Sequence, residues 1–165
     1  MLFFAILAIA TAGAALVVRQ RRAAARWGFG IALAVAGGTH LANPVPFEQH
    51  LPDWVPAAGA LVAVTGLLEI ALGVALVAHG RRRAAVGLLT AAYLAAVFPA
   101  NVYVALAGVE VDGQPGGIYP WIRLPFQALF IAWVLWSTRE APTANDPRLP
   151  TVTSRPGAPA PVGRR

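Results

Sequence analysis

The chain contains neither cysteine nor lysine, and each absence excludes a class of chemistry. Without cysteine it can form no disulfide of its own, no thiolate nucleophile and no cysteine-held iron–sulfur cluster. Without lysine it has no amine for a Schiff base or for a phosphate-binding Walker loop. The only serines, Ser137 and Ser154, lie outside the Gly-x-Ser-x-Gly pattern of serine hydrolases.

Charged residues are also scarce, since they make up 12% of the 165 residues while 58% are hydrophobic. This composition indicates one domain that is too apolar to be an ordinary soluble protein. The net charge of +6 comes from arginines that stand in short clusters beside apolar runs. Such clusters are typical of membrane proteins, so we expect the lipid bilayer as a partner and no binding to nucleic acid.

Apolar stretches predict five transmembrane helices, at residues 2–18, 23–42, 58–79, 84–106 and 121–138. The first stretch is followed by arginines rather than preceded by them, so we expect a retained helix instead of a cleaved signal peptide. Proline-rich residues 43–56 are expected to form an outer loop. Residues 139–165 hold six prolines and few large apolar side chains, which predicts a disordered tail.

The distribution of arginine predicts the topology. Residues 19–26, 81–83 and the tail are basic, whereas the loops at 43–56 and 108–120 contain no arginine. Five crossings place every basic segment on the cytoplasmic side, with the N-terminus outside and the C-terminus cytoplasmic. The expected fold is therefore an all-α helical bundle in the membrane.

One carboxylate interrupts the third apolar stretch. Glu69 lies near the middle of residues 58–79, which would span ~33 Å as a helix. A carboxylate at that depth costs a few kcal/mol unless it has a polar partner. Gly59, Gly66 and Gly73 are spaced seven apart and share the face of Glu69, so a second helix can approach closely. We therefore predict that Glu69 points into a tightly packed bundle.

Other polar side chains are predicted to lie in the outer half of the same bundle. They suggest an outward-facing polar pocket with Glu69 at its floor, and its candidates for ligand binding or proton exchange are Glu69, His40, Asn101, Arg123, Gln127 and Thr65. No catalytic residue is assigned. The alternative is structural, because buried polar side chains often only join helices, and an arginine can extend toward headgroups.

A metal site is not expected. His40, Glu48, His50 and Asp53 are suitable residue types, but they show no recognised ligand spacing. We therefore expect none of these residues to bind a metal ion.

Several segments between residues 35 and 135 carry a family resemblance. They read GGTHLANPVPF (37–47), LPDWVP (51–56), TGLLEIALG (65–73), FPANVYVAL (98–106) and WIRLPFQALFIAW (121–133). In order and spacing they resemble the DoxX-like family of small bacterial integral membrane proteins. The resemblance implies a multi-pass plasma-membrane protein with a four-helix core, to which the first helix is an addition.

The same resemblance implies a direction for function, because some DoxX-like proteins are subunits of quinone-linked sulfur oxidoreductases. It suggests a redox-associated membrane subunit that binds a quinone-like or other amphipathic ligand. Its partner would be a membrane oxidoreductase or another membrane protein, and a homo-oligomer stays open. Two alternatives also stay open, namely a non-enzymatic scaffold or assembly factor, and a proton-coupled transporter with Glu69 as its relay. Whether the chain catalyses a reaction is undecided.

Overall fold

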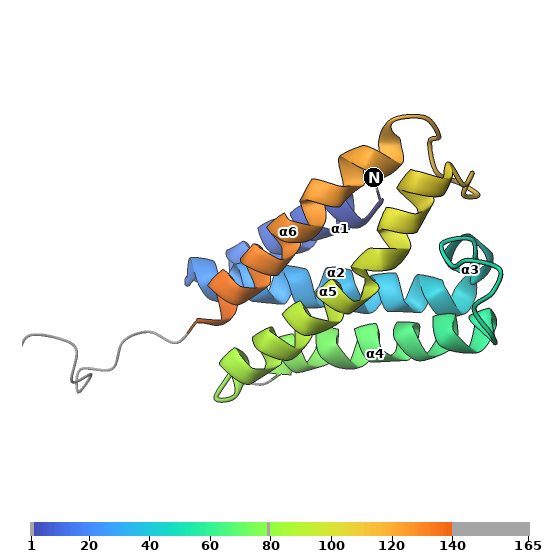
Figure 1. Ribbon diagram of the computed structural model, residues 1–165. Helices are drawn as coiled ribbons and strands as arrows, with labels where there is room; N and C mark the ends of the chain where they lie inside the picture. The colour runs from blue at the N-terminus through green and yellow to red at the C-terminus, as the bar shows by residue number, and fades with distance from the viewer. Residues whose placement is uncertain (1, 79, 140–165) are drawn as a thin grey trace, which may run out of the picture.

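The computed structural model describes residues 2–78 and 80–139, and these residues are all-α, as predicted (Figure 1). They form six helices and no strand: α1 (Leu2–Val17), α2 (Arg21–Ala42), α3 (Val45–Glu48), α4 (Ala58–Ala78), α5 (Arg83–Ala107) and α6 (Tyr119–Thr138). The prediction of a disordered tail concerns residues that, apart from Arg139, lie outside this described part.

The five long helices begin and end within two residues of the stretches expected from hydropathy. The short helix α3 was not expected, because it lies inside the proline-rich segment. Pro46 stands in the first positions of α3, where a helix needs no backbone N–H donor. The prolines of this segment therefore prevent a long helix but permit a single turn.

Glycines let α2 and α4 pack almost backbone to backbone. A methyl group on Gly30 would lie 2.7 Å from the carbonyl oxygen of Gly73. A methyl group on Gly66 would lie 2.9 Å from the carbonyl oxygen of Gly37. Both distances are too short for carbon and oxygen, so glycine is required at these crossings. Gly66 and Gly73 thus make the close approach expected of them, whereas Gly59 faces the side chain of Glu48.

The remaining helices complete a bundle in which α5 packs mainly on α6, while α1 and α6 pack on α2. Figure 1 shows α5 leaving the end of α4 and rising beside α6. The core where they meet contains the fully buried side chains of Phe29, Leu33, Leu76 and Val134.

By length and composition, α4 and α5 could each cross a membrane, and α1 is a shorter apolar helix. Two of the five expected spans therefore meet this test. Large apolar side chains cover the outside of the bundle, since Leu16 is 90% exposed and Leu88 is 64% exposed. Both side chains lie on long apolar helices, where a lipid environment would be favourable for them.

Candidate functional site

The polar side chains of the bundle separate into two clusters. The carboxylate cluster consists of Glu69, His40, Thr65 and Tyr93, which come from α2, α4 and α5. The arginine cluster consists of Arg123, Asn101, His50 and Gln114. Asn101 belongs to α5 and Arg123 to α6, His50 follows α3, and Gln114 lies in the loop between α5 and α6. Gln127 belongs to neither cluster.

Glu69 is the centre of the carboxylate cluster. Its side chain is buried, with the residue 8% exposed, because it lies between the two glycine crossings of α2 and α4. The hydroxyl of Tyr93 donates a hydrogen bond of 2.8 Å to Oε1 of Glu69. The second oxygen, Oε2, is buried and has no hydrogen-bond partner, and Nε2 of His40 lies 3.7 Å from it. One carboxylate oxygen is therefore satisfied by the protein and the other is not.

The position of His40 is fixed by α3 and α4. Its ring packs against Phe47 of α3 with 3.8 Å between ring centroids. Its Nδ1 lies 3.5 Å from the hydroxyl of Thr65, and that hydroxyl donates to the carbonyl of Val62 at 3.0 Å. Thr65 therefore accepts from Nδ1 of His40, which leaves Nε2 facing the unpartnered oxygen of Glu69.

This arrangement has a chemical consequence. In a neutral histidine with its proton on Nδ1, Nε2 is an acceptor, and it faces the acceptor Oε2 of Glu69. Two buried acceptors that face each other are unfavourable unless a proton or a donor group stands between them. The carboxylate cluster can therefore hold a proton between His40 and Glu69, or accept a hydrogen bond from a bound hydroxyl.

Arg123 organises the second cluster with neutral acceptors. Its guanidinium donates to Nε2 of His50 at 3.1 Å, to Oδ1 of Asn101 at 2.9 Å and to Oε1 of Gln114. Among the described residues no carboxylate pairs with Arg123. These contacts join α5 and α6 to the segments at 43–57 and 108–118, so Arg123 holds this end of the bundle together.

His50 has only one protonation state that suits its contacts. Its Nδ1 lies 2.7 Å from the carbonyl of Pro46, which can only accept, so Nδ1 carries the proton. Its Nε2 accepts from Arg123 and must therefore be unprotonated. Burial lowers the pKa of His50 to about 4, and the positive charge of Arg123 acts in the same direction. His50 is thus neutral at physiological pH.

A second contact between the segment after α3 and the α5–α6 loop lies next to His50. The side chain of Gln49 donates to Asp112 at 3.1 Å and accepts from the backbone N–H of Asp112 at 2.8 Å. Gln49 and His50 therefore connect the segment after α3 to the loop between α5 and α6.

Gln127 lies apart from both clusters and donates to the carbonyl of Leu94 at 2.6 Å. It borders a small cavity of about 170 Å³ between α5 and α6. The other lining residues are apolar: Ala95, Phe98, Leu124, Ala128 and Ile131. Pro99 deprives the carbonyl of Ala95 of its helical donor, so this stretch of α5 has an irregular hydrogen-bond ladder.

A larger cavity of about 580 Å³ lies against α3 and the adjoining ends of α4 and α5. Its lining combines apolar side chains, such as Val45 and Leu51, with Glu48, Asp53 and Tyr103. Glu69 borders neither cavity. Within residues 2–78 and 80–139, no group of three or more potential metal-ligating side chains gathers.

The six candidates from the sequence are thus divided. Glu69, His40 and Thr65 lie together, Asn101 and Arg123 lie together, and Gln127 bonds to the backbone of α5. The residues missing from the set of candidates were Tyr93, His50 and Gln114. The sequence does indicate Tyr93, because it lies eight residues before Asn101 and therefore on the same face of its helix. The loop residues His50 and Gln114 carry no periodic signal.

Comparison with known proteins gives a family without an assigned activity. Searches of curated proteins and of solved structures each found no match. The resemblance to DoxX-like proteins stays a prediction. A family model described as "Domain of unknown function (DUF8561)" matches residues 29–138, which include α3 to α6, most of α2 and both polar clusters. The chain therefore belongs to the DUF8561 family.

Proposed function

We propose that the chain is a multi-pass protein of the bacterial plasma membrane, crossing it with α1, α2, α4, α5 and α6. The lengths and apolar composition of α4 and α5 support this placement, as do the exposed leucines on the bundle surface. The N-terminus is outside and the C-terminus is cytoplasmic. The DoxX-like sequence pattern, which is typical of small bacterial membrane proteins, favours the plasma membrane.

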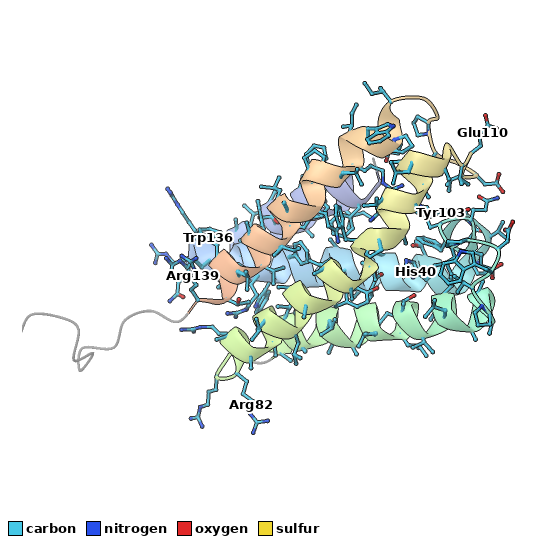
Figure 2. All side chains as sticks on the ribbon, in the orientation of Figure 1. His40, Arg82, Tyr103, Glu110, Trp136 and Arg139 are labelled. Atoms are coloured by element: carbon cyan, nitrogen blue, oxygen red, sulfur yellow. The ribbon has the colours of Figure 1, made fainter. Side chains whose placement is uncertain are left out.

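The two ends of the bundle differ in charge, which supports this orientation. Figure 2 shows Arg82, Trp136 and Arg139 at one end, away from His40, Tyr103 and Glu110. The first end also holds the arginines of residues 19–26 and 81–83. The second end holds Glu48, Asp53 and Asp112. By the positive-inside rule the arginine-rich end is cytoplasmic.

Within this placement, the carboxylate cluster binds the polar head of an amphipathic, quinone-like ligand, and the protein serves as a redox-associated membrane subunit. The observation that carries this proposal is the facing pair of His40 Nε2 and Glu69 Oε2, which are 3.7 Å apart. A quinol hydroxyl would donate to Oε2, and a protonated His40 would donate to a quinone carbonyl. An isoprenoid tail would lie along the apolar surface of the bundle.

A structural role is the second candidate, and one observation favours it. Most other polar side chains in the bundle bond to one another or to backbone, as Arg123 and Gln127 do. Contacts of this kind join helices without any ligand. A protein of this kind would act as a scaffold or assembly factor, with Glu69 as one more helix contact.

Purification from native membranes separates the two candidates. The affinity-tagged full chain is extracted in mild detergent, and its quinones and co-purifying proteins are measured by mass spectrometry. We expect a quinone in stoichiometric amount and a membrane oxidoreductase. His40→Gln should lower the amount of quinone per protein, whereas Glu48→Gln, which changes a carboxylate outside the cluster, should not. A stoichiometric protein partner without any quinone would favour the scaffold.

A further inference from the structure

Two arginines at the arginine-rich end of the bundle each have a buried nitrogen atom and no counter-ion among the described residues. Arg26 of α2 is only 9% exposed, and Arg83, the first residue of α5, is partly buried. The Nε atom of each is buried and has no hydrogen-bond partner. Within the described residues no carboxylate pairs with either side chain. One N–H of each guanidinium group is therefore buried without a partner among the described residues.

The two side chains also act on each other. They are close enough for the positive charge of Arg83 to oppose that of Arg26. Burial of Arg26 removes water that would otherwise stabilise its charge, so the nearby positive charge of Arg83 is unfavourable for it without an anion. A bound anion would offset one of the two positive charges and accept hydrogen bonds from the guanidinium groups.

The end of α6 connects the two helices that carry these arginines. The indole N–H of Trp133 donates to the carbonyl of Ala25 at 3.1 Å, next to Arg26. On the other side Gly87 of α5 packs so closely on Thr138 that a methyl group would lie 2.6 Å from its Cβ atom. The end of α6 therefore packs on α2 next to Arg26 and on α5 one turn from Arg83.

The surroundings of the pair resemble the edge of a bilayer. Arg22, one turn before Arg26, lies 5.9 Å from the ring of Trp136, and that tryptophan is 40% exposed. Tryptophan is enriched at the height of lipid headgroups. Leu88 and Leu89, about one and a half turns from Arg83, are more than 60% exposed and offer apolar surface for acyl chains.

We propose that Arg26 and Arg83 together bind the phosphate group of an anionic phospholipid at the cytoplasmic end of the bundle. The guanidinium fork matches the geometry of phosphate oxygens, and basic pockets between helices on this side of a membrane suit anionic headgroups. The inference rests on the membrane placement proposed above but not on the quinone ligand. Inorganic phosphate carries the same chemistry, so the test separates the two sources.

The test compares the full chain in nanodiscs of phosphatidylcholine alone with nanodiscs that also contain phosphatidylglycerol. Arg26→Gln and Arg83→Gln remove one charge each from the pair, and Arg82→Gln removes one from an exposed neighbour as the matched control. Melting temperature and the number of phosphatidylglycerol molecules retained in native mass spectrometry are measured. Inorganic phosphate is added to the phosphatidylcholine discs as a separate arm.

We expect phosphatidylglycerol to raise the melting temperature of the wild type and of Arg82→Gln by the same amount. In Arg26→Gln and Arg83→Gln the rise should be largely lost, and the affinity for phosphatidylglycerol should fall roughly tenfold, as expected for the loss of one charge-assisted contact. In phosphatidylcholine alone both variants should melt no lower than the wild type, because an unpaired buried cation has been removed.

Three outcomes would overturn the inference. An equal response of all four proteins would mean that lipid charge acts diffusely on the arginine-rich end. Stabilisation by inorganic phosphate, with no difference between the two lipids, would assign the pair to a soluble anion. Loss of stability in phosphatidylcholine for both pair variants would mean that the arginines have protein partners. Failure to enter nanodiscs would instead refute the membrane placement itself.

Discussion

Acidification should weaken the end of the bundle that holds Arg123, because it protonates His50. Both ring nitrogens of His50 are committed, one as donor to Pro46 and one as acceptor from Arg123. A proton added to Nε2 turns the acceptor into a donor and places a positive charge against the Arg123 guanidinium. The hydrogen bond between them is then lost. It is one of two contacts, the other being that of Gln49 with Asp112, that hold the segment after α3 against the α5–α6 side of the bundle.

The size of the effect follows from the pKa of His50. Burial holds it at about 4 in the folded protein, against 6.5 for an ordinary histidine. Between these pH values the unfolded chain binds more protons than the folded chain, so the free energy of unfolding falls as the pH falls. A difference of about 2.5 in pKa corresponds to a loss on the order of 3 kcal/mol, complete near pH 4.

The assay is thermal unfolding of the full chain in detergent at a series of pH values from 7.5 to 4. Carboxylates also titrate in part of this range, so the quantity of interest is the difference between the wild type and His50→Gln. The variant should lose stability less steeply below pH 6.5, because it has no proton to gain at this position. Identical slopes for the two proteins would refute the assignment of the effect to His50.

Three further predictions concern packing, the arginine cluster and topology. Gly37→Ala should lower the melting temperature by forcing α2 and α4 apart. Gly38→Ala should not, because nothing lies within 4 Å of the added methyl group. Equal melting temperatures for the two variants would contradict the close crossing of the helices. Arg123→Lys should cost roughly 1 to 3 kcal/mol in the free energy of unfolding, because lysine cannot reproduce the forked hydrogen bonds, while Arg82→Lys, an exposed control, should cost nothing measurable. A reporter fused at Gln114 should read external and one in the C-terminal tail cytoplasmic, and a cytoplasmic signal at Gln114 would contradict five crossings.

Hydropathy and glycine spacing predict much of this architecture. The helices lie where apolar runs predict them, because their lengths are set by local sequence. The spacing of Gly66 and Gly73 predicts a close helix contact, and the contact occurs. The partner glycines Gly30 and Gly37 have the same seven-residue spacing in the sequence, but spacing alone does not say which helix faces which.

The division of the polar residues could not be predicted in this way. Counting residues along a helix gives the depth of a side chain but not the neighbouring helix that it faces. Residue counting therefore predicts one pocket for Glu69 and Arg123, whereas they lie in different clusters, one of α2, α4 and α5 and the other of α5, α6 and two loops. Asn101 and Gln127 show the same limit of residue counting. Asn101 of α5 accepts a hydrogen bond from Arg123 of α6, whereas Gln127 of α6 donates to a backbone carbonyl of α5. Contacts from loops, such as those of His50, depend on a backbone path that no periodicity describes.

Glu69, on the proposed function, is retained for a ligand and not for folding. Glu69→Gln keeps the shape of the side chain without its charge, and Glu69→Leu removes the polar group together with its desolvation cost. The most direct measurement is the amount of quinone that co-purifies per protein, taken beside the melting temperature in detergent. We predict that both variants fold, that Glu69→Leu melts at or above the wild-type temperature, and that both lose the quinone. Wild-type quinone content in Glu69→Leu would contradict the claim and favour the scaffold.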